Sequence, residues 1–75
     1  MKIEGRNAVA ELVKKSAKIE KIYIETGLNN PESKRLVEEI KNRGVRVQFL
    51  PKTAMDKESE THRHQGFIAV TEDYK

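Results

Sequence analysis

Residues 19–50 read IEKIYIETGLNNPESKRLVEEIKNRGVRVQFL, and they contain the sequence signals of two strands with a helix between them. Its first seven residues, Ile19–Glu25, are typical of a strand, because Ile22 and Ile24 fall on one face and Tyr23 falls on the other. A loop of small and polar residues follows this strand. The stretch therefore opens with a half-buried strand that leads into a helix.

The helix has recognisable start and stop signals. Asn30 is a good N-cap, and Pro31 fits the first helical position, where its missing N–H costs nothing. Gly44 supplies the left-handed residue that ends a helix, so the helix is expected to run to about Arg43. Its apolar positions recur at helical spacing, which places three side chains inward: Leu36, Val37 and Ile40.

A second strand is expected over Val45–Leu50, with its apolar side chains on one face: Val45, Val47 and Phe49. Phe49 is expected to be a core residue, like Tyr23 and Phe67. Pro51 then prevents further strand pairing and starts a short helix through about Lys57. This helix is expected to bury Ala54 and Met55.

Outside this unit the same alternation continues. Residues 2–4 are expected to form a short strand, and a helix follows from about Arg6 to Ser16, with four apolar positions at helical spacing: Ala8, Val9, Leu12 and Val13. Phe67–Val70 is continuously apolar, which is typical of a strand covered on both faces. Strands that alternate with helices predict one α/β domain over residues 1–75, a small three-layer α/β/α domain with a mixed, mostly parallel sheet. Its ordered core is expected over about residues 3–72, and residues 71–75 are expected to fray.

Composition excludes several classes of protein. The chain has no Cys, which excludes disulfides and thiolate metal sites and favours a cytoplasmic location. No apolar run approaches a membrane span, so no membrane contact is expected. The net charge of +3 is unevenly spread: residues 1–30 carry six Lys or Arg against four Glu, residues 31–50 five against three, and residues 51–75 four against five acidic residues. A positive N-terminal two-thirds suits contact with phosphate, although a solvated lysine-rich surface has the same composition.

Two polar motifs lie at opposite ends of the chain. Glu4-Gly5-Arg6-Asn7 precedes the first expected helix, and His64-Gln65-Gly66 precedes the last expected strand. As structural elements they would be a helix start capped by Asn7 or Glu4 and a strand entry where another backbone approaches Gly66. As a binding site, Arg6 would offer its planar fork of donors to phosphate, and Asn7 would read a base edge or a 2′-hydroxyl.

Together these motifs, in this order and about sixty residues apart, resemble the N-terminal substrate-binding domain of the SpoU-type (SPOUT class) RNA 2′-O-ribose methyltransferases. That domain opens with a Gly-Arg-Asn-Ala helix start and closes with a His-Gln-Gly strand. The resemblance covers roughly residues 3 to 72 and implies a fold similar to the ribosomal L30e and L7Ae proteins. It also implies that residues 71–75 begin an interdomain linker.

The resemblance implies that structured RNA, either rRNA or tRNA, is the partner. The residues expected to contact it are Arg6, Asn7, Lys14, Lys18, Arg63, His64 and Gln65. S-adenosylmethionine would bind to a separate C-terminal knotted domain of the same protein, which is expected to be dimeric. That domain's cofactor motifs are missing from this sequence, so the chain itself is expected to bind no cofactor and to have no catalytic residue.

Several alternatives remain open from the sequence. The second hypothesis is a free-standing RNA- or ribosome-binding module similar to L30e and L7Ae, with no enzyme attached. It would also suit a protein-interaction module that docks to a methyltransferase dimer. His62 and His64 form a His-x-His pair, but two ligands with only loop carboxylates nearby make a weak metal site, so no metal is expected. Because each terminal motif has more hydrogen-bonding capacity than its own element needs, we expect Arg6 and the His64–Gln65 pair to form one site.

Overall fold

The structure, a computed structural model, describes residues 2–15, 19–59 and 65–71. Within these ranges the elements follow in the order β1 (Lys2–Glu4), α1 (Arg6–Lys14), β2 (Ile19–Glu25), α2 (Pro31–Asn42), β3 (Val47–Leu50), α3 (Lys52–Glu58) and β4 (Phe67–Thr71). The predicted α/β class and the order of the elements are confirmed. The first helix ends slightly earlier than predicted, and β3 begins at Val47 instead of Val45.

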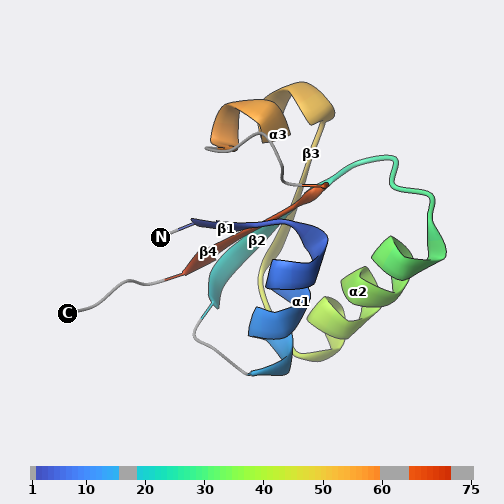
Figure 1. Cartoon of the computed structure of the whole chain (residues 1–75), viewed down its shortest axis with the longest axis vertical. Helices are drawn as coiled ribbons and strands as arrows, with labels where there is room; N and C mark the ends of the chain where they lie inside the picture. The colour runs from blue at the N-terminus through green and yellow to red at the C-terminus, as the bar shows by residue number, and fades with distance from the viewer. Residues whose placement is uncertain (1, 16–18, 60–64, 72–75) are drawn as a thin grey trace.

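The elements form three layers. Helices α1 and α2 cover one face of the sheet, and the short helix α3 lies on the other face (Figure 1). The larger part of the core lies between the sheet and the first two helices, and its buried members are Val9, Val13, Ile22, Ile24, Leu36, Ile40, Phe67 and Ala69. The predicted α/β/α layering is confirmed. The inward positions of α2 are also confirmed, as are those of α1 except Ala8, which is not among the residues packed on this core.

The sheet is mixed, with strand order β1-β4-β2-β3. Only β2 and β3 pair in parallel, whereas β4 is antiparallel to both of its neighbours, so the expectation of a mostly parallel sheet is wrong. The reason is visible at the carboxyl end of β2. There Thr26 N–H donates to the Leu50 carbonyl and Glu25 N–H donates to the Gly66 carbonyl, both at 2.9 Å. Strand β4 therefore begins at the same end of the sheet at which β3 ends. The chain does not return to the other end of the sheet between these two strands, so β4 runs antiparallel to β2 and β3.

Helix α3 is attached to the sheet by apolar and polar contacts. Met55 is fully buried against Tyr23 and Ile68, which form the core of the second face. Lys2 Nζ in β1 lies 3.0 Å from the Glu58 carbonyl and 3.1 Å from Glu58 Oε1. These contacts join the first strand of the sheet to the end of α3.

The start and stop signals of α2 behave as the sequence predicts. The Asn30 side chain accepts a hydrogen bond of 2.9 Å from Ser33 N–H, which satisfies one of the free donors at the helix start. Gly44 has φ of 73° just after the helix, in the left-handed region that glycine adopts without a Cβ clash. Among the described residues no helix is both long and apolar enough to cross a membrane.

Met55→Ala is expected to destabilise the domain by about 2–4 kcal/mol, because it leaves a cavity between α3 and the sheet that the neighbouring side chains fill only partly. Lys57→Ala, on the exposed side of the same helix, is the matched control and should change stability by less than about 0.5 kcal/mol. Urea unfolding followed by circular dichroism measures both. Equal stability of the two variants would show that α3 does not depend on Met55.

Candidate functional site

The sheet register brings the two terminal motifs together. In the β1–β4 pair, Glu4 lies opposite Ile68, and the next step is made by Gly5 N–H, which donates to the Phe67 carbonyl at 3.1 Å. One further step places Arg6 beside Gly66 and Gln65. The first turn of α1 and the start of β4 therefore meet at one end of the sheet, as predicted.

Gln65 makes the contact between the motifs. Its side-chain Oε1 accepts a hydrogen bond of 3.3 Å from the backbone N–H of Arg6, at the first position of α1. Gly5 is the N-cap residue and has no side chain to accept such a bond. The Glu4 carboxylate accepts a hydrogen bond from the hydroxyl of Ser59. The helix start is thus capped from the other end of the chain.

Gln65 reaches this position through an unusual backbone. Its φ is 51°, and among the described residues it is the only non-glycine with positive φ. Single non-glycine residues in this region are uncommon and cost free energy. The next residue, Gly66, has φ of 87°, so two left-handed residues in succession turn the chain into β4. This turn aims the Gln65 side chain at the start of α1.

The Arg6 side chain forms a second connection. Its Nη2 lies 3.1 Å from Glu32 Oε2, in the first turn of α2, so Arg6 links the amino ends of two helices. The Glu32 side chain is 72% exposed, whereas that of Arg6 is 29% exposed. An ion pair that is so open to solvent contributes little stability. The guanidinium is therefore held in position but remains available to a stronger anion.

The other predicted contact residues are placed unevenly. Asn7 is exposed in the first turn of α1, next to Arg6. Lys14 is exposed at the opposite end of that helix, roughly 12 Å away by helical rise, so it does not join Arg6. Lys18, Arg63 and His64 lie outside the described residues. Among the residues that the structure describes, no group of three His, Cys, Asp or Glu side chains is placed to hold a metal ion.

Gly66 lies against both a backbone and a side chain. The expected close approach of another backbone is present, because Glu25 N–H donates to the Gly66 carbonyl at 2.9 Å. A Cβ at this position would lie 2.9 Å from Leu28 Cδ2 and 3.0 Å from Leu28 Cδ1. Leu28, in the loop after β2, packs partly buried against the main core. Gly66 therefore makes room for the loop that carries the chain from β2 into α2.

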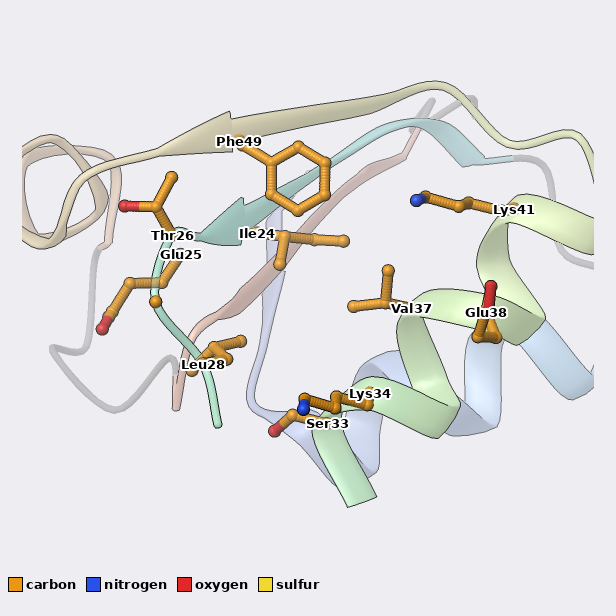
Figure 2. Close-up of a pocket in the computed structure, with 11 residues that line it drawn as sticks. Ile24, Glu25, Thr26, Leu28, Ser33, Lys34, Val37, Glu38, Lys41 and Phe49 are labelled. Carbon is orange, nitrogen blue, oxygen red and sulfur yellow. The ribbon is translucent and has the colours of Figure 1, made fainter. Parts of the chain in front are cut away.

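A cavity of about 440 Å³ opens beside this loop, and the sequence did not predict it. It lies between α2 and the edge strand β3, and Ile24, Leu28, Val37 and Phe49 line its apolar part (Figure 2). Phe49 was expected to be a core residue, but it is 49% exposed. The strand pattern correctly placed Phe49 on the same face of the sheet as Val47. The pattern did not reveal that β3 lies at the edge of the sheet, where α2 does not cover the Phe49 side chain.

The fold and the site together define a small α/β binding domain, whose polar side chains converge on the start of a helix. The chain belongs to the family of RNA 2′-O ribose methyltransferase substrate-binding domains, because the sequence model of that family matches residues 2–75.

Relatives agree with this membership. The chain is 28% identical over 71 residues to YacO of Bacillus subtilis (strain 168), a protein assigned to the TrmH family of tRNA/rRNA methyltransferases. The match covers 95% of this chain and 28% of YacO, so the chain spans little more than a quarter of the length of that relative.

Two solved structures have the same fold. A Bacillus halodurans protein of unknown function superposes with a TM-score of 0.72 and 13% identity, over 95% of this chain and 71% of that one. The archaeal translation termination factor aRF1 superposes with a TM-score of 0.67 and 18% identity, over 97% of this chain and 20% of that one. At these identities the likenesses show the fold alone.

Gly66→Ala is expected to destabilise the domain more than Gly27→Ala does. Both residues have positive φ, 87° and 86°, so the strained backbone of either alanine should lower the free energy of unfolding by about 1–2 kcal/mol. Only at Gly66 does the new Cβ meet another residue, Leu28, whereas Gly27 has nothing within 4 Å. The displaced Leu28 should add about 1 kcal/mol or more. Chemical denaturation of both variants measures the difference, and equal losses would mean that the Leu28 contact carries no cost.

Proposed function

We propose that this chain is the RNA-holding domain of a longer RNA 2′-O-ribose methyltransferase. Membership of the family supports RNA as the ligand. The hydrogen bond from Arg6 N–H to Gln65 Oε1 is the observation that carries the proposal, because it joins the two polar motifs into one surface. Neither motif needs so many donors and acceptors for folding alone.

The chemistry of this surface suits an RNA backbone. The guanidinium of Arg6 can make charge-assisted hydrogen bonds to phosphate oxygens. When RNA binds, a phosphate would replace the Glu32 carboxylate as the partner of Arg6. The N–H groups of the first turn of α1 add the positive end of the helix dipole. Asn7, exposed beside Arg6, offers both a donor and an acceptor to a base edge or a 2′-hydroxyl.

Four further residues are proposed to contact the RNA. Arg63 and His64 directly precede Gln65 in the sequence, so they are proposed to contact phosphate and a base next to the Arg6 site. Lys14 and Lys18, at and beyond the far end of α1, are proposed to contact phosphate only. A contact of that kind adds affinity without reading the sequence of the RNA.

In the longer protein the domain would present a structured rRNA or tRNA to a separate catalytic domain. S-adenosylmethionine would supply the methyl group there, and this chain would contribute binding and orientation only. A dimeric catalytic domain, a cytoplasmic location and a likeness to the L30e and L7Ae proteins belong to the same proposal.

Arg6→Ala and Gln65→Ala are each expected to weaken binding of an rRNA or tRNA hairpin by about 1–3 kcal/mol. The double variant should lose less than the sum, because Gln65 holds the helix start from which Arg6 projects. Lys14→Ala is the matched control at the other end of α1 and should cost less. Titrations at two salt concentrations should give a log–log slope of about −2 to −4 for the wild-type chain. Strict additivity, or affinity that does not depend on salt, would contradict the shared phosphate site.

Glu32→Gln is expected to strengthen RNA binding by about two- to fivefold, because it removes the carboxylate that competes with phosphate for Arg6. Folding stability should stay within about 0.5 kcal/mol of the wild type, since the pair is exposed. Glu39→Gln is the control, because it breaks the comparable pair with Arg43, 3.5 Å apart, at the other end of α2. The same hairpin titration measures both. An equal gain in both variants would mean that net charge, and not release of Arg6, sets the affinity.

A further inference from the structure

The cavity beside Phe49 has features that the proposed Arg6 site does not use. Among the described residues, Phe49 is the one large apolar side chain that is exposed. Its ring stands over the open space between β3 and α2, with Ile24 and Val37 forming the apolar walls (Figure 2). A half-exposed aromatic ring at the mouth of an apolar cavity offers a surface on which a planar ligand can stack.

Cations and carboxylates surround this ring. Lys41 Nζ lies 6.0 Å from the centre of the Phe49 ring, and Lys34 lines the same cavity from the same face of α2, two helical turns earlier. Glu25 and Glu38 also line it, so the rim carries two charges of each sign. A nucleotide has a matching set of groups, since its base stacks on an aromatic ring, its phosphate pairs with lysine, and its exocyclic amine donates to a carboxylate.

The cavity lies next to residues of the Arg6 site. Leu28 lines the cavity and touches Gly66, the residue that follows Gln65. Ser33 lines it as well, and the preceding residue, Glu32, is the partner of Arg6. Both features lie at the carboxyl ends of the parallel strands β2 and β3, where ligands bind in open α/β sheets. A single RNA would therefore meet both.

We infer that the cavity binds one unpaired nucleobase, which stacks on Phe49, while Lys41 and Lys34 contact the flanking phosphates. This inference rests on the proposed RNA function and adds a preference to it. The Arg6 site holds the backbone of structured RNA, and the Phe49 cavity selects RNA that has an unstacked base nearby. The volume of about 440 Å³ is within the range of sites that hold small molecules.

Binding of two RNA probes by the whole chain tests the inference. One probe is a hairpin with an all-adenosine loop, and the other is a duplex with the same stem and no unpaired nucleotide. Phe49→Ala should weaken binding of the hairpin by about five- to fiftyfold and leave binding of the duplex unchanged. Lys41→Gln should lower the salt slope for the hairpin by about one. The melting temperature of each variant checks that the exposed positions tolerate the change.

Tryptophan provides a direct probe of stacking, because the chain contains none. Phe49→Trp should retain hairpin binding, and short oligoadenylate should quench its fluorescence. Gln48→Trp is the control, because Gln48 is exposed on the same strand but alternates to the other face of the sheet. Equal quenching of both variants would overturn the inference.

The two proposals fail in different ways. If the wild-type chain binds neither probe, the proposed RNA function is overturned and this inference with it. If the wild type binds the hairpin and Phe49→Ala binds it equally well, only the inference is overturned, and the cavity belongs to another kind of partner.

Discussion

The position of β4 between β1 and β2 is the constraint on which the rest of this domain depends. The last strand of the chain lies inside the sheet and pairs with the first strand on one side. Three of its residues, Phe67, Ile68 and Ala69, are completely buried, and they contribute to both faces of the core. The domain cannot complete its core until nearly the whole chain has been folded back on itself, a closure that is costly in entropy.

The same constraint builds the polar site. Once Glu4 lies opposite Ile68, the register leaves Arg6 next to Gln65 and Gly66. The left-handed backbone of Gln65 then turns its side chain onto the helix start. Gln65 thus has a structural role and a proposed binding role at the same time. A residue that caps the helix also fixes the point from which Arg6 meets a ligand.

Local signals in the sequence were sufficient for most of the elements. Asn30, Pro31 and Gly44 marked the limits of α2 because capping and left-handed turns depend on the residue type at one position. The direction of β4 was mispredicted, because strand direction depends on where the chain re-enters the sheet and not on the residues of the strand.

The candidate site was predictable only in part, for a similar reason. Gly and polar residues beside two apolar elements indicated that Arg6 and Gln65 belong together. Two contacts of the site depend on how α2 is placed on the sheet, and local sequence patterns do not predict that placement. They are the ion pair of Arg6 with Glu32 and the packing of Leu28 against Gly66. Phe49 was predicted on the correct face, but its exposure depends on the edge position of β3.

The two ends of the chain meet at one surface, and we propose that this surface contacts RNA. The most direct measurement is a titration of the ¹⁵N-labelled chain with an unlabelled rRNA hairpin, followed by amide NMR shifts. The largest changes are expected on the backbone amides of Arg6, Asn7 and Gly66 and on the side-chain amide of Gln65. Changes confined to α3, on the opposite face of the sheet, with those four signals unmoved, would show that RNA does not contact this surface.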